Sequence, residues 1–108
     1  MAHYLFQIAY TSEAWAEQLR NPRSFMDRAT PLIEGLGGSI ESAYYSFGEY
    51  DIAVIVELPD NVSMAACSLA ISAGGAAKTA KTTPLMTLDE GVEAMRKAGG
   101  AGYRPPGG

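Results

Sequence analysis

A chain of 108 residues has the length of one domain, with room for a hydrophobic core but little for a second one. The formal net charge of −4 and the eight scattered Lys and Arg residues argue against nucleic-acid binding, which depends on clustered positive charge. One cysteine, Cys67, excludes an internal disulfide, and no apolar segment approaches the roughly 20 residues of a membrane span. The N-terminus lacks the pattern of a signal peptide, so we expect a cytoplasmic protein without a membrane partner.

The first strand is predicted over residues 3–10, where apolar side chains occupy both faces. Two helical segments are expected to follow it. Thr11 or Ser12 would cap the first, and Pro22 would take the first position of the second, which ends at the double glycine 37–38. Pro31 is expected to kink or shorten that second helix because its ring removes one hydrogen bond.

The stretch from residue 39 to residue 58 predicts two strands joined by a tight turn at residues 48–51. The first of these strands covers residues 39–47. From Tyr50 to Leu58 every second residue is large and apolar, so one face of the second strand is wholly apolar, while the other face carries Asp51, Ala53, Ile55 and Glu57. Gly48 is expected to supply the positive φ that a short hairpin connection often needs.

A second helix–strand unit is predicted next. Asp60 would cap a helix over residues 61–73, and a strand follows over residues 76–87, where Pro84 requires an edge, a bulge or the strand's end. The helix carries almost no charge, so we expect something besides its own sheet to cover it. Cys67 within it is interpreted as a small buried hydrophobe.

A capping box at residues 87–90 opens a last helix that reaches Ala98. The domain is therefore expected over residues 1–98. The Gly- and Pro-rich tail over residues 99–108 is predicted to be flexible.

The order β-α-β-β-α-β-α predicts an α+β fold, a ferredoxin-like βαββαβ sandwich with an extra C-terminal helix. Its four-stranded antiparallel sheet has helices on one face only. The other face would carry Leu5, Ala9, Ala53 and Ile55, or the opposite set if the faces are reversed. An open apolar sheet face marks an interface, so we expect a homodimer or a higher oligomer formed through it.

Gly48-Glu49-Tyr50-Asp51, followed by an apolar strand and Pro59-Asp60, resembles the signature of the GYD-domain family. The resemblance extends to residues 4–11, to residues 36–38, and to the Lys-Thr and Thr-Thr pairs of the last strand, so it covers roughly residues 3–90. The resemblance implies a ferredoxin-like fold of the dimeric α/β-barrel type, and it implies no established activity.

Candidate ligand-binding residues fall into two groups. Trp15, Tyr45 and Tyr50 could line a pocket between helices and sheet and stack on a flat apolar ligand, although core or interface packing explains such aromatics as well. His3 and Asp51 could lie on one sheet face with Gln7 and Glu57, where a His with carboxylates binds metals or moves protons. Alternatively, Asp51 simply accepts hydrogen bonds from backbone donors at the turn.

Two functions follow from these patterns. The first is a homo-oligomeric module that binds a small metabolite. The alternative is a cofactor-independent oxygenase or isomerase acting on a small aromatic or ketone-like compound, with His3, Tyr50 and Asp51 as possible acid–base groups. Neither hypothesis calls for a cofactor or a metal, and neither fixes catalytic residues.

Overall fold

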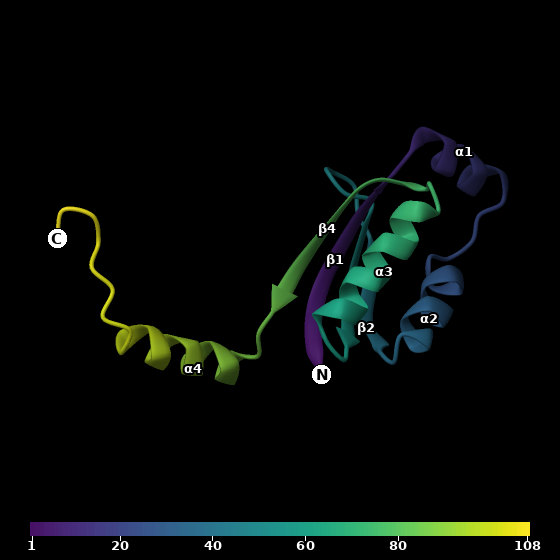
Figure 1. Cartoon of the computed structure of the whole chain (residues 1–108). Helices are drawn as coiled ribbons and strands as arrows, with labels where there is room; N and C mark the ends of the chain where they lie inside the picture. The colour runs from purple at the N-terminus through teal and green to yellow at the C-terminus, as the bar shows by residue number, and fades with distance from the viewer.

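The computed structural model describes all 108 residues, and the chain folds into one four-stranded antiparallel sheet with four helices (Figure 1). The elements in chain order are β1 (Ala2–Tyr10), α1 (Ser12–Arg20), α2 (Met26–Gly35), β2 (Ser39–Tyr45), β3 (Ile52–Leu58), α3 (Asn61–Ala73), β4 (Ala77–Leu85) and α4 (Leu88–Gly99). The strand order β2-β3-β1-β4 places the first and third strands in the centre, as a ferredoxin-like fold requires. The predicted fold is confirmed.

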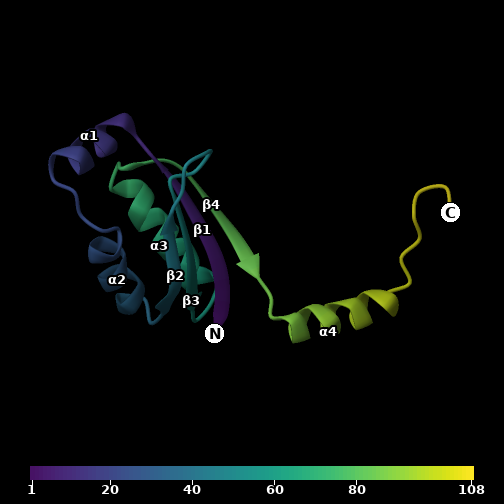
Figure 2. The same cartoon turned by 180° about the vertical axis from the view of Figure 1, so that it is seen from behind.

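The hydrophobic core lies between the sheet and the two helices α2 and α3, which pack on the same side of it (Figures 1 and 2). Alternate residues of the two central strands point into this core, because successive strand side chains face opposite sides of a sheet. They are joined by Phe25, Ala29 and Ile33 from around α2, and by Met64 and Cys67 from α3. The strand residues of the core are Tyr4, Phe6, Ile8 and Tyr10 on β1, and Ile52, Val54, Val56 and Leu58 on β3.

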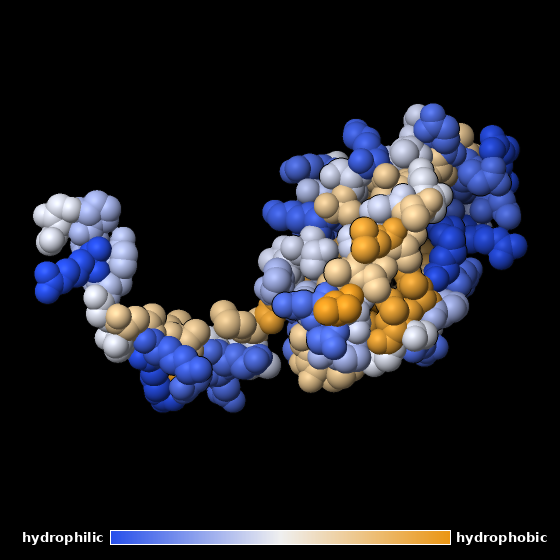
Figure 3. Space-filling view, in the orientation of Figure 1, coloured by the Kyte–Doolittle hydropathy of each residue, from blue (hydrophilic) through white to orange (hydrophobic).

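The opposite sheet face is open in the chain and presents three of the four residues predicted for it, whereas the fourth, Ala9, is buried. Leu5, Ala53 and Ile55 are half-buried there, and Tyr44 on β2 is largely exposed. None of the helices lies over this face (Figures 1 and 2). The outer side of α3 is also uncovered, since Val62 and Leu69 are 78% and 70% exposed. Figure 3 shows apolar residues gathered over this helix.

Helix α4 projects from the end of β4 as a separate arm (Figures 1 and 2). The predicted capping box is present, because Thr87 accepts from the Glu90 backbone and the Glu90 carboxylate accepts from the Thr87 N–H. No residue of α4 is buried. Its apolar residues Leu88, Val92 and Met95 follow a helical spacing of four and three, so they share one side of an exposed helix.

Three local predictions were wrong. The connection between β2 and β3 spans six residues, 46–51, so Tyr50 and Asp51 lie in a loop before the strand. Gly48 has no positive φ, and its surroundings are open. Pro22 does not begin the second helix, because α2 starts only at Met26 and residues 21–25 form a non-helical connection.

Pro31 lies inside α2, which continues past it to Gly35, so the proline does not end the helix. Pro84 lies on β4, and this edge position explains how a strand accommodates a residue that donates no hydrogen bond. The predicted caps Thr11 and Asp60 accept hydrogen bonds from Ala14 and Ser63 respectively.

Candidate functional site

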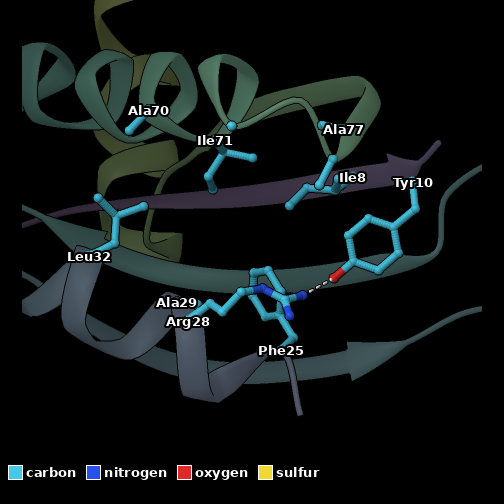
Figure 4. Close-up of a pocket in the computed structure, with 11 residues that line it drawn as sticks. Ile8, Tyr10, Phe25, Arg28, Ala29, Leu32, Ala70, Ile71 and Ala77 are labelled. Atoms are coloured by element: carbon cyan, nitrogen blue, oxygen red, sulfur yellow. Dashed lines mark hydrogen bonds between the residues drawn. The ribbon is translucent and has the colours of Figure 1, made fainter. Parts of the chain in front are cut away.

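A cavity of about 260 Å³ lies between α2, α3 and the end of the sheet. Its walls are mostly apolar, and they come from β1, both helices and the start of β4 (Figure 4). The lining residues are Ile8, Tyr10, Phe25, Arg28, Ala29, Leu32, Ala70, Ile71, Gly74, Ala76 and Ala77. The small side chains of α3 and β4 leave this space unfilled, because alanine and glycine reach too little volume to close the gap between the layers.

Two ionisable side chains face this cavity, Arg28 and Tyr10. An Arg28 Nη2–H donates to the Tyr10 hydroxyl oxygen over 2.8 Å, so the arginine extends from α2 toward the end of β1 (Figure 4). Burial raises the pKa of Tyr10, and the neighbouring Arg28 charge only partly opposes this effect. Tyr10 is therefore a neutral phenol at physiological pH.

Asp51 contacts this pair through hydrogen bonds to the backbone of Tyr10 and to Trp15. One carboxylate oxygen, Oδ2, accepts from the backbone N–H of Tyr10 at 2.8 Å and from the indole N–H of Trp15 at 3.2 Å. The Trp15 ring in turn meets the Tyr10 ring edge-on, with centroids 5.2 Å apart. The candidates Asp51 and Trp15 thus converge on Tyr10 without lining the cavity themselves. Asp51 does accept from a backbone donor, but this donor belongs to the end of β1 and not, as predicted, to the turn.

Tyr45, at the end of β2, also contacts a residue next to the cavity, just before the start of α2. Its hydroxyl accepts from the backbone N–H of Phe25 at 2.9 Å, and Phe25 is one wall of the cavity. Trp15 and Tyr45 also share an open surface groove of about 510 Å³ with Phe47. Tyr50 is not part of it, because its loop turns toward Gln7 and Lys81.

His3 lies at the far end of β1, seven residues or roughly 23 Å from Tyr10 along the strand. It does not meet Asp51. Its Nδ1 is 2.7 Å from a carboxylate oxygen of Glu41, and its Nε2 is 3.6 Å from one of Glu57. Glu57 is the direct cross-strand partner of His3, while Glu41 lies where the register of β2 against β3 shifts.

Among the residues of the chain, His3, Glu41 and Glu57 are the group that could hold a divalent cation, since their ligand atoms lie within 4.8 Å of one another. An imidazole in direct contact with the two carboxylates explains the same geometry, and such a contact needs no ion.

Sequence reasoning missed Arg28 as a site residue. The available signal was its place beside the apolar stripe of α2, three residues after Phe25 and four before Leu32. A cationic side chain at this spacing lies next to the apolar stripe of α2. It can therefore reach the edge of the surface on which that stripe packs. The apolar stripe of α2 was predicted correctly. The gap between α2 and α3, however, depends on how the two helices pack, and no local sequence pattern indicates that packing.

Comparisons with known proteins support the fold and the family. The family model of the GYD domain matches residues 4–95. Among solved structures, one described as "crystal structure of FFRP-DM1" is similar, with a TM-score of 0.50 and 16% sequence identity over 80% of this chain and 100% of that chain. At that identity the likeness concerns the fold alone. A comparison with curated proteins gives no match. Separately, none of the four helices has the length and apolar character to cross a membrane.

Proposed function

Because this chain belongs to the GYD-domain family, whose signature residue Asp51 here braces the wall of an apolar cavity, we propose that it is a homo-oligomeric module that binds a small metabolite in that cavity. The observation that carries the proposal is the cavity itself. A space of about 260 Å³ between layers, walled by apolar side chains with two polar groups, has the character of a small-molecule site.

Binding is favoured over the enzymatic alternative by the chemistry of the lining. Its ionisable groups are Arg28 and Tyr10. Arginine stays protonated at all physiological pH values, and the raised pKa of Tyr10 makes its phenol a poor general base. Proton abstraction from a bound substrate would require a group that this lining does not supply.

Self-association is supported by three uncovered apolar surfaces, namely the open sheet face, the outer side of α3 and the stripe on α4. A helix of twelve residues is marginal in water by itself, so α4 needs a surface to pack on. Figure 3 shows hydrophilic and hydrophobic residues on opposite sides of this arm. A second copy supplies both a matching arm and an open sheet face, and a closed symmetric dimer buries them together.

The binding proposal is tested by recording ¹H–¹⁵N NMR spectra during a titration with 1-hexanol, a neutral apolar probe. We expect saturable shifts at Ala29, Ile71 and Ala77. Ala70→Phe should abolish them by obstructing the cavity that Ala70 lines, while Ala65→Phe, at a position of the same helix that is also exposed but lies outside the lining, should leave them unchanged. Shifts that never saturate, or that survive Ala70→Phe, would refute binding in this cavity.

The assembly proposal is tested by light scattering at micromolar concentration. We expect a dimer or a multiple of one, and dissociation when Val92→Lys and Met95→Lys place charges on the apolar stripe of α4. Glu93→Lys, on an exposed position of the same helix, is the matched control. A monomeric wild-type chain would contradict the proposal.

A further inference from the structure

We infer that the ligand of this cavity is a small monocarboxylic acid with an apolar tail, whose carboxylate binds between the Arg28 guanidinium and the Tyr10 hydroxyl. This inference rests on the proposed function, because it names the ligand class of the same cavity. The tail would lie against Leu32, Ile71 and Ala77, in the interior that Figure 4 shows.

The charge of Arg28 is available to a ligand. The ion pairs of the chain join His3 to Glu41 and Glu57, Arg20 to Glu17, and Arg96 to Glu93, and none of them involves Arg28. The side-chain partner of its guanidinium is the neutral Tyr10 hydroxyl. In a chain with a net charge of −4, an arginine without a carboxylate partner at the edge of an apolar cavity favours an anion over a neutral or cationic ligand.

Arg28 and Tyr10 both offer hydrogen-bond donors at the point where their side chains meet. Tyr10 accepts from Arg28, so its own O–H proton is free to donate to a second oxygen. The guanidinium has further N–H groups in a planar fork that matches the two oxygens of a carboxylate. One carboxylate could therefore accept from both residues without moving either helix.

The remaining lining limits the rest of the ligand. Leu32, Ala70, Ile71, Ala76 and Ala77 offer no hydrogen-bonding side chains, so a second charged or hydroxylated end would lose its hydration without compensation. The cavity volume of about 260 Å³ restricts the tail to a short chain or a single ring. A monocarboxylate satisfies both conditions, whereas dicarboxylates and sugars do not.

Asp51 and Trp15 are positioning residues in this arrangement. They hold the backbone and ring of Tyr10, and thereby the hydroxyl that anchors Arg28. Because they act through Tyr10, their loss should weaken the preference for the acid over its amide, while binding of the neutral amide should change less.

The experiment compares hexanoate with hexanamide, which differ in charge but hardly in size, by isothermal titration of the full chain. We expect hexanoate to bind about 10- to 100-fold more tightly, the advantage of a charge-assisted pair over a neutral one. Arg28→Gln should remove that advantage, Arg28→Lys should retain part of it, and Tyr10→Phe should reduce it. Arg104→Gln, which removes the same charge from the exposed tail, should leave it intact.

The outcomes separate the two proposals. Equal binding of acid and amide would overturn the carboxylate inference and leave the cavity as a site for neutral ligands. An advantage that persists in Arg28→Gln would also overturn it, because the anion would then bind elsewhere. Binding of neither compound would refute the proposed function together with the inference. If Arg28→Gln fails to fold, Arg28→Lys and Tyr10→Phe still measure the contribution of the pair.

Discussion

Replacing Asp51 tests whether the GYD signature stabilises the end of the sheet beside the cavity. Asp51→Ala leaves two part-buried donors, the Tyr10 N–H and the Trp15 indole N–H, without the oxygen that accepts from both. At about 1.5 kcal/mol for each bond to a charged acceptor, the loss is about 3 kcal/mol of unfolding free energy. For a domain of this length that corresponds to a fall in Tm of roughly 10 to 25 °C.

Both bonds end on the same carboxylate oxygen, so Asp51→Asn can keep them with a neutral acceptor and should lose only about 1 kcal/mol. Urea denaturation followed by fluorescence measures these values directly, because Trp15 is the single tryptophan of the chain. All variants must be compared at one protein concentration, since the proposed self-association would make apparent stability depend on concentration. Glu49→Ala, an exposed change in the same loop, is the control. If Asp51→Ala is no more destabilising than Glu49→Ala, the reasoning is refuted.

Three further predictions concern the rest of the domain. Gly38→Ala should prevent folding, because a Cβ there would lie 2.0 Å from the Glu57 carbonyl oxygen. Gly48→Ala, where a Cβ meets open space, should leave the Tm nearly unchanged, and thermal denaturation measures both variants. Asp60→Ala removes the cap of α3, because the Asp60 carboxylate accepts from the Ser63 N–H, and should lower the urea midpoint of unfolding. Burial raises the pKa of Cys67 to about 11 from 9.0, so its thiol should resist alkylation at pH 8 until urea unfolds the chain. The unfolded thiol ionises first, so stability should fall between pH 9 and 11, and less steeply in Cys67→Ala; equal slopes would show that Cys67 is not responsible.

Local patterns predicted the fold because each one has a direct physical cause. Alternation from Ile52 to Leu58 determined which side chains of β3 are buried, and Thr11, Asp60 and the Thr87–Glu90 box marked three helix starts. The strand order followed from the split βαβ topology rather than from any single residue.

The loop before β3 was harder to predict. The alternation from Tyr50 onward continued the strand pattern by two residues, but β3 begins only at Ile52, and the Asp51 carboxylate accepts from the N–H of Tyr10, a residue 41 positions earlier in the chain. Contacts this distant in sequence have no local signature. The expected positive φ at Gly48 failed for a related reason, because a six-residue connection does not need the strained turn that a two-residue hairpin requires.

The structure brings some of the candidate residues together and separates the others. Asp51, Trp15 and Tyr45 lie behind the walls of one cavity, whereas His3 and Tyr50 lie elsewhere. Spacing along a strand fixes the face of a side chain but not the register of neighbouring strands, so the sequence could not separate His3 from Asp51. The cavity depends on how closely α2 and α3 approach the sheet, a result of the packing of the whole core.

The central claim is that a small apolar acid occupies the cavity between α2 and α3. An isotope-filtered NOE experiment between unlabelled hexanoate and ¹³C-labelled protein tests it most directly. We predict NOEs from the hexanoate chain to the methyl groups of Leu32, Ile71 and Ala77. NOEs confined to Leu5 and Ile55 on the open sheet face, or none at saturating hexanoate, would contradict the account.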